Sequence, residues 1–147
     1  MFSDTTLIVG VDVHGRTNVT LAMDGQGDVL DKHQRFPNHG TGTEQLARYL
    51  AQLAQGGGFD TIHLAAEATN NFWLPFFCQL GQSPQLSPWT LTLYPFNPRL
   101  VRNFKKALAK MRKQTCGMPV SSLNVYALAK NCLVPFLWKN YTCRCVP

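Results

Sequence analysis

Three short strand-like runs follow one another within the first 35 residues, and the links between them restrict the fold more than any other feature. Residues 6–13 are apolar and β-branched, residues 16–24 alternate apolar with small or polar side chains, and residues 28–35 form a weaker, polar run. The second link is a turn signal, Asp24-Gly25-Gln26-Gly27. Because links this short join only antiparallel neighbours, we predict a three-stranded meander.

Helical and strand-like segments alternate after the meander. A helix should begin near Thr41 and Glu44, which have capping-box spacing, and end at the glycines of residues 56–58. Its apolar face is formed by Leu46, Leu50 and Leu53. A strand over residues 60–66, a helix over 71–80, a strand over 91–96 and a basic helix over 99–113 should follow. The order βββαβαβα predicts an α/β, RNase H-like mixed sheet, in which three antiparallel strands are followed by parallel ones.

Charge is distributed unevenly along the chain. All eight acidic residues precede residue 68, alongside only four Lys or Arg, whereas residues 68–147 hold ten basic residues and no acid. A basic half favours contact with a polyanion, most simply nucleic acid, although charge runs also occur on solvated surfaces. The sequence has no secretory signal, no membrane-spanning run and no zinc-site spacing among its cysteines. We therefore expect a cytoplasmic protein without membrane contact.

Two acidic residues end strand-like runs. Asp12 lies near the end of the first run, over residues 6–13, and Glu67 directly follows the strand-like run over residues 60–66. These strands should be central neighbours, so both carboxylates should emerge at one edge of the sheet. Carboxylates held close together repel unless a cation lies between them, and Mg²⁺ or Mn²⁺ prefers such oxygen ligands. Two ions at such a site can support phosphodiester cleavage, although strand-end acids also occur without metal. His14 could face this site or simply lie in the loop.

Residues 99–113 combine a cationic stripe with an apolar face. The cations are Arg99, Arg102, Lys105, Lys106, Lys110, Arg112 and Lys113, and Leu100, Phe104 and Leu108 lie opposite. Next to a nuclease site, this stripe would bind DNA phosphates without sequence preference. A solvated amphipathic helix is the alternative. The aromatic residues of the preceding helix should be core rather than base-stacking residues; they are Phe72, Trp73, Phe76 and Phe77.

Three segments together resemble the DEDD transposases of the IS "one-ten" insertion-sequence family. They are Ile8–Thr17, Ala66–Trp73, and Asn97-Pro98 leading into Val101–Lys106, and the resemblance extends over roughly residues 6–113 in the family's order. The N-terminal domain of these enzymes is similar to the RuvC Holliday-junction resolvase. The resemblance implies that Asp12 and Glu67 are two of four carboxylates that bind two Mg²⁺ ions. It also implies DNA as substrate and, for an intact protein, a structured guide RNA and a homo-oligomer.

The remaining two carboxylates of the family are missing. In the family the basic helix leads into Lys-Thr-Asp-x-x-Asp-Ala, whereas Met111-Arg112-Lys113 is followed here by residues 114–119 without an acid. If one base is restored in the gene between codons 113 and 114, the shifted reading frame permits the family motif. In that frame, the bases of codons 118 and 119 can encode only the alanine of the motif. We therefore expect residues 1–113 to be an incomplete RuvC-like domain and 114–147 an out-of-frame, poorly ordered tail.

The leading prediction is a truncated transposase that cuts and joins DNA with divalent metal in its intact form. With two of four ligands, this copy should be nearly or fully inactive. A stand-alone RuvC-type resolvase or nuclease is one alternative, but it would need carboxylates in the last helix. A sugar-kinase-like ATPase is a second alternative, but it would need glycine-rich, phosphate-binding turns on two lobes. A non-catalytic DNA-binding remnant would be consistent with the same truncation.

Overall fold

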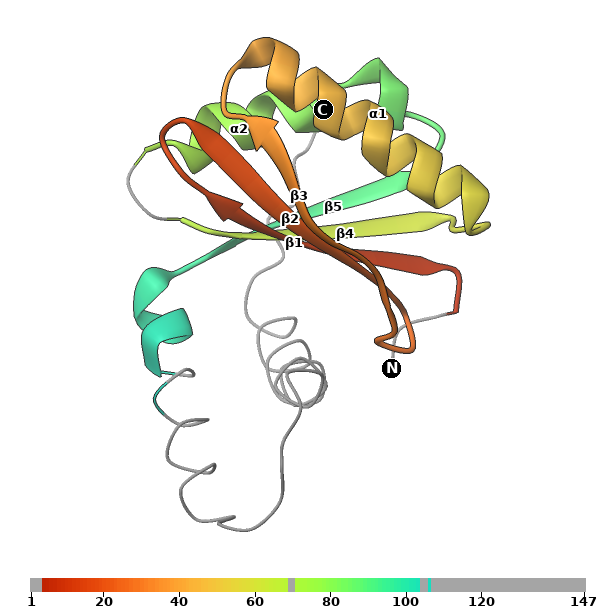
Figure 1. Cartoon of the computed structure of the whole chain (residues 1–147), viewed down its shortest axis with the longest axis horizontal. Helices are drawn as coiled ribbons and strands as arrows, with labels where there is room; N and C mark the ends of the chain where they lie inside the picture. The colour runs from red at the N-terminus through yellow and green to blue at the C-terminus, as the bar shows by residue number, and fades with distance from the viewer. Residues whose placement is uncertain (1–3, 69–70, 104–105, 107–147) are drawn as a thin grey trace, which may run out of the picture. The chain divides into compact units, whose positions relative to one another are not determined.

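The computed structural model describes residues 4–68, 71–103 and 106, and the chain divides into two units, Met1–Phe96 and Asn97–Pro147. In the first unit, five strands form one sheet with the order β3-β2-β1-β4-β5, and helices α1 and α2 lie on one side of it (Figure 1). The strands are β1 (Thr6–Val13), β2 (Thr17–Asp24), β3 (Val29–Pro37), β4 (Thr61–Glu67) and β5 (Thr90–Phe96). The helices are α1 (Gly40–Gly56), α2 (Trp73–Gly81) and the 3₁₀ turn η1 (Pro84–Leu86).

The sheet is mixed, and its topology agrees with the sequence prediction. β1, β2 and β3 form an antiparallel meander, while β4 runs parallel to β1 and β5 runs parallel to β4. The two parallel connections contain α1 and α2, as crossovers between parallel strands require. The chain is therefore an α/β protein with a mixed five-stranded sheet.

The two faces of the sheet carry different side chains, because side chains alternate along each strand. The helix face is covered by α1 and α2, and its residues on β1 and β4 are at most 5% exposed (Figure 1). They are Leu7, Val9, Val11, Ile62, Leu64 and Ala66. The other face, which we call the far face, carries the alternating positions, Ile8, Gly10 and Asp12 on β1 and His63, Ala65 and Glu67 on β4.

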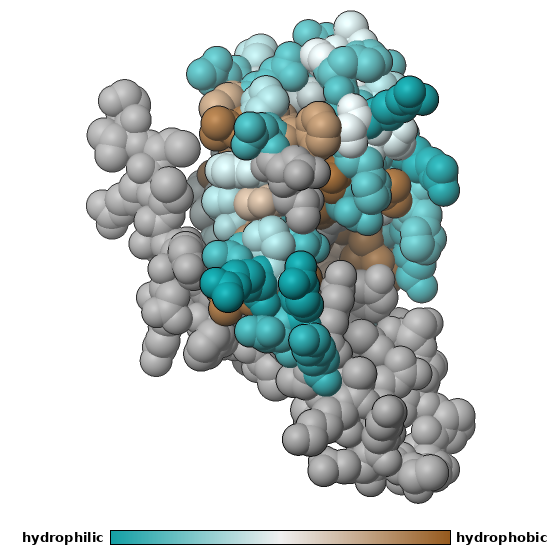
Figure 2. Space-filling view, turned by 90° about the vertical axis from the view of Figure 1, so that its left-hand side faces the viewer, coloured by the Kyte–Doolittle hydropathy of each residue, from teal (hydrophilic) through white to brown (hydrophobic). Residues whose placement is uncertain are grey.

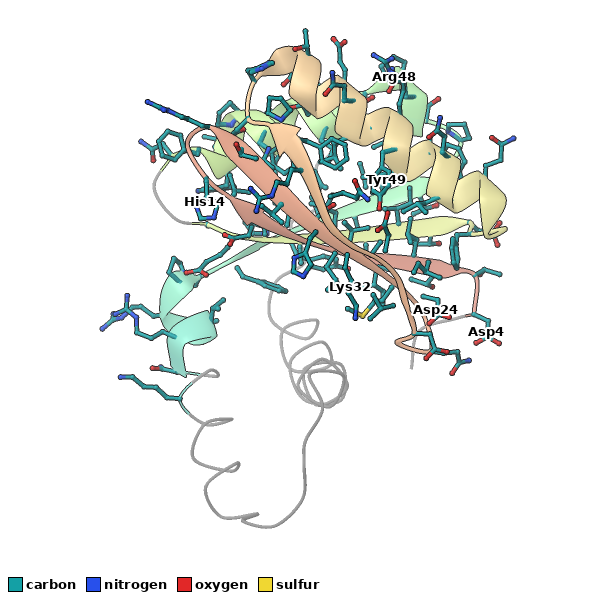
Figure 3. All side chains as sticks on the ribbon, viewed as in Figure 1. Asp4, His14, Asp24, Lys32, Arg48 and Tyr49 are labelled. Atoms are coloured by element: carbon teal, nitrogen blue, oxygen red, sulfur yellow. The ribbon has the colours of Figure 1, made fainter. Side chains whose placement is uncertain are left out.

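The predicted apolar face of α1 packs against this core. Leu46 and Leu50 are fully buried, and Leu53 is partly buried against the same cluster. Burial of each such side chain contributes about 1.5–3 kcal/mol. The Tyr49 side chain lies between α1 and the sheet, where its hydroxyl donates a hydrogen bond of 2.9 Å to Oδ2 of Asp31 (Figure 3). This hydrogen bond is the main cause that lowers the pKa of Asp31.

The predicted capping box of Thr41 and Glu44 is wrong. α1 takes His39 as its N-cap, and no side chain caps the helix. The Thr41 hydroxyl lies 2.9 Å from Nδ1 of His39 instead. Gly42 allows this first turn to approach β3 closely, since a side chain there would clash with the Pro37 carbonyl. Close packing on the strand therefore replaces the expected cap.

The glycines of residues 56–58 end α1, as predicted. Gly58 adopts the left-handed backbone with a φ of 65°, and the N–H of Phe59 donates to the Ala54 carbonyl over 2.8 Å. Phe59 is only 7% exposed. The turn that ends the helix therefore also packs against the core.

The edge strand β3 contains a β-bulge. Its pairing with β2 passes from Thr20↔Gln34 to Leu21↔Lys32, which leaves His33 as an extra residue. His33 has a φ of 61°, a left-handed conformation that side chains other than glycine adopt at a cost. The extra residue shifts the alternation of side chains along β3 by one position. This shift decides which of its residues lie on the far face.

The aromatic residues of α2 are core residues, with one exception. Phe76 and Phe77 are buried, and Trp73 packs partly buried against the same cluster. The prediction for Phe72 is wrong, because this side chain is 45% exposed. It precedes α2 as its N-cap, and its ring lies close to Gly15 in the link between β1 and β2.

In the second unit, residues 98–103 and 106 are helical, consistent with the start of the predicted basic helix. The N–H groups of Leu100 and Val101 donate to the Asn97 carbonyl over 3.0 and 3.2 Å. The remainder of that helix and the predicted tail over 114–147 lie outside the described residues. Within the described part of the chain, no helix has the length and apolar character needed to cross a membrane.

Candidate metal and nucleic-acid site

Asp12 and Glu67 lie beside each other near the ends of two adjacent parallel strands. The register of β1 and β4 pairs Val11 with Ala66, and each acid is the next residue of its strand. Paired residues of neighbouring parallel strands direct their side chains to the same face, and such strands are about 4.8 Å apart. Both carboxylates therefore belong to one row on the far face. The predicted adjacency of the two strands is confirmed.

The two carboxylates differ in exposure. The Asp12 side chain is 70% exposed and its Oδ2 lies 3.1 Å from Nε2 of His14, whose side chain is 62% exposed. Glu67 is half-buried. Nδ2 of Asn38 donates a 2.7 Å hydrogen bond to the His14 carbonyl, which fixes the loop that carries the imidazole. His14 lies in the link between β1 and β2, and its imidazole contacts the Asp12 carboxylate.

Two other carboxylates of the first unit have structural roles. Oδ1 of Asp24 accepts three backbone hydrogen bonds of 2.8–2.9 Å within the turn between β2 and β3. Asp31 accepts the Tyr49 hydroxyl. Asp24 and His14 lie toward opposite ends of the sheet (Figure 3). Because their oxygens already accept hydrogen bonds within the fold, Asp24 and Asp31 are poorer candidates for metal binding than the exposed Asp12.

Small residues lie next to the acidic row. In the transverse row next to that of Asp12 and Glu67, Gly10 pairs with Ala65 of β4 on one side and with Leu21 of β2 on the other. A Cβ added to Gly10 would meet nothing within 4 Å among the described residues. Glycine within a strand often marks a position where a ligand or another backbone approaches closely. Among the described residues, the centre of the far face thus has space next to Asp12 and Glu67.

The β5 side of the far face is aromatic and largely buried. Nδ1 of His63 lies 3.0 Å from the Tyr94 hydroxyl, and each residue is 8% exposed. Burial lowers the pKa of His63 to about 4 and raises the pKa of Tyr94. Both side chains are therefore neutral at pH 7. The ring of Phe96 lies 6.4 Å, centroid to centroid, from that of Tyr94. This side of the far face therefore carries uncharged, aromatic side chains beside Asp12 and Glu67.

Sequence reasoning missed two cations on the same face. Arg35 pairs with Val19, which is also the partner of Asp12 on the neighbouring strand. Lys32 lies on the side of the sheet away from α1, and both cations are exposed (Figure 3). Residues three apart in a regular strand face opposite sides, so the extra residue His33 is what brings Lys32 and Arg35 to one face. Nothing in the amino-acid pattern marked this bulge.

The predicted cations of the second unit are only partly described. Arg99, Arg102 and Lys106 are exposed on the helical residues 98–103 and 106. The other four predicted cations, Lys105, Lys110, Arg112 and Lys113, lie outside the described residues. Figure 2 shows hydrophilic residues interspersed with hydrophobic ones on the described surface that faces the viewer.

The described residues contain no group of three or more His, Cys, Asp or Glu side chains arranged to hold a metal ion. The acidic pair therefore offers two carboxylates, with His14 against one of them. Models of known protein families give no match to this chain, and no curated protein sequence matches it either.

Proposed function

We propose that the chain is a fragment of a DNA-cutting transposase of RNase H-like fold, in which Asp12 and Glu67 are two ligands of a divalent metal. The observation that carries the proposal is the register of β1 and β4, which sets these acids in one row on one face. The sheet order β3-β2-β1-β4-β5, with three antiparallel strands followed by parallel ones, supports the RNase H-like part of the proposal.

The residues present suit a hard cation. Mg²⁺ and Mn²⁺ prefer carboxylate oxygens, and an ion between Asp12 and Glu67 would relieve their mutual repulsion. When bound, such an ion would stabilise the charge that develops on the phosphodiester oxygens during cleavage. Asp12 and Glu67 would hold the ion, and His14 would orient the Asp12 carboxylate from 3.1 Å away. Gly10, which has no side chain, would let the DNA backbone approach the sheet.

The transposase assignment draws on the resemblance of residues 6–113 to the DEDD enzymes. Within this proposal DNA is the substrate, and an intact relative works with a structured guide RNA and as a homo-oligomer. No carboxylate follows Glu67 in the sequence, so the ligand set is half of what the family uses. The chain itself should therefore bind metal weakly and cleave DNA little or not at all.

A cleavage assay on branched DNA with Mg²⁺ or Mn²⁺ tests this proposal. The chain is compared with a version whose reading frame is restored after residue 113, and with that version carrying Asp12→Asn. We expect cleavage only by the restored protein, lost on Asp12→Asn substitution. Absence of cleavage by a folded restored protein would contradict the nuclease assignment. Strong activity of the unrestored chain would contradict the account of its missing ligands.

A second candidate function is a non-catalytic DNA-binding remnant. The exposed cations Arg99, Arg102 and Lys106, together with the absence of acids after Glu67, favour it. Phosphate binding by such residues is electrostatic and depends steeply on salt. DNA binding by the chain in EDTA, without cleavage after metal is added, is the result that this candidate predicts.

A further inference from the structure

A line of charged residues crosses the far face from the edge strand to the acidic pair. The pairings Arg35↔Val19 and Val19↔Asp12 place one cation and one carboxylate in the same transverse row, and Glu67 continues that row on β4. Neighbouring strands are about 4.8 Å apart, so the Arg35 backbone is about 10 Å from that of Asp12. The positive charge of Arg35, on the edge strand, thus lies on the same face of the sheet as the negative charges of Asp12 and Glu67, on the central strands.

Lys32 adds a second cation one row away. It pairs with Leu21, the neighbour of Gly10, and is exposed like Arg35. The two cations share a face only because His33 is inserted between them in the left-handed conformation. A strained residue that persists in an edge strand and aligns two exposed cations on the face of the acidic row suggests a functional reason for the bulge.

The other two described cations of the first unit, Arg16 and Arg48, do not belong to the strands of the far face. Arg48 is on the outer side of α1, away from the sheet, whereas Lys32 is on the opposite side of the sheet (Figure 3). Arg16 is exposed in the link between β1 and β2. Arg48 is therefore a matched control for Arg35, because its substitution changes the net charge equally without altering the far face.

We propose that Arg35 and Lys32 bind phosphates of DNA lying across the far face, so that its backbone reaches the Asp12–Glu67 row. Guanidinium groups bind phosphate through paired hydrogen bonds, and ammonium groups bind it as point charges. The backbones of Arg35 and Asp12 are about 10 Å apart, and the Arg35 side chain extends further, so both residues lie within the width of one DNA duplex. One duplex can therefore contact both. The inference rests on the proposed function, which it deepens by assigning the path of the DNA.

DNA binding by the full chain in EDTA provides the test, because metal and cleavage are then not involved. Fluorescence anisotropy with a labelled DNA duplex is measured over a series of KCl concentrations for the chain, Arg35→Gln, Lys32→Gln and Arg48→Gln. We expect each far-face substitution to reduce the slope of log affinity against log salt by about 0.9, and to weaken binding about fivefold to tenfold near 0.1 M salt. Arg48→Gln should leave both quantities unchanged. Arg35→Lys should retain most of the binding.

The outcomes separate this inference from the proposed function. If the chain binds DNA but Arg35→Gln and Lys32→Gln bind as tightly as the unsubstituted chain, the assigned path is wrong and the nuclease proposal stands. An equal loss in Arg48→Gln would show a non-local effect of net charge and overturn the path as well. If the folded chain binds no DNA at any salt concentration, both proposals fail. If the same substitutions weaken the binding of a matched RNA duplex but not of the DNA duplex, the partner is RNA instead. Circular dichroism of each variant confirms that the fold is retained.

Discussion

The two faces of one sheet differ in what their residues do. On the helix face, Leu7, Val9 and Leu64 are completely buried beneath α1 and α2. On the far face, the same strands carry the exposed Asp12 and, one row away, Gly10, beside which the described residues leave space for a side chain. Alternation along each strand therefore lets one set of strands contribute stability on one face and chemistry on the other. Charged and small residues are tolerated where packing does not require apolar ones.

The largest expected effect is on the free energy of unfolding, when a leucine on each face is replaced by alanine. Leu64 is fully buried on the helix face, whereas Leu21 is half-buried on the far face. Leu64→Ala should lower the free energy of unfolding by about 3 kcal/mol, because it leaves a cavity in packed surroundings. Leu21→Ala should cost no more than about 1.5 kcal/mol, because part of its side chain already contacts solvent. Urea unfolding of both variants measures the difference, and equal losses would remove the distinction between the faces.

The buried His63 is an exception on the far face, and it makes that face sensitive to acid. Its pKa is about 4 in the folded protein, against an ordinary value of 6.5, because burial disfavours the charged ring. The unfolded chain therefore binds the proton first as the pH falls. The contribution to stability is complete above pH 6.5 and is lost as the pH falls toward 4.

Unfolding free energies at pH 7 and pH 4.5 measure this effect. Between these values, the unsubstituted chain should lose about 2–3 kcal/mol more than His63→Gln, which cannot take up the proton. Glutamine can also hydrogen-bond the Tyr94 hydroxyl, so the variant should fold. The same pH dependence in both proteins would show that His63 is not buried as described.

The smallest expected effect concerns the bulge of β3. His33→Gly should raise the free energy of unfolding by about 0.5 kcal/mol, since glycine adopts a positive φ without steric cost but loses more entropy on folding. His33→Val should lower it by about 1 kcal/mol, because a β-branched side chain is strained in that conformation. Thermal unfolding distinguishes the two substitutions. Stabilisation by valine would indicate that β3 is a regular strand and that Lys32 and Arg35 face opposite sides.

The amino-acid sequence was sufficient to predict which strands are antiparallel and which are parallel, and the reason is geometric. Links of two or three residues force antiparallel pairing, while a helix between strands permits parallel pairing. The adjacency of the strands that carry Asp12 and Glu67 does not follow from these rules alone; it was predicted from the RNase H-like layout, and the pairing of β1 with β4 confirms it. Residues 40–56 were recognisable as a helix from the spacing of Leu46 and Leu50, and its glycine end was predicted correctly.

What the sequence could not reveal depends on tertiary contacts. The start of α1 is set by packing of Gly42 against Pro37, which overrides the capping-box pattern. The exposure of Phe72 depends on its position before α2 and over Gly15. The far-face location of Arg35 depends on a bulge, and a bulge inserts one residue without a reliable local signal. The cations nearest to Asp12 in the sheet register were therefore overlooked.

The measurement that most directly tests the central claim is Mn²⁺ titration of the isotope-labelled chain, followed by paramagnetic broadening of its backbone amide signals. We predict that signals near Asp12 and Glu67 broaden first and that Asp12→Asn removes this early broadening. The turn at Asp24, toward the opposite end of the sheet, provides an internal comparison (Figure 3). Broadening that begins at Asp24, or that is unaffected by Asp12→Asn, would contradict a metal site at the acidic row.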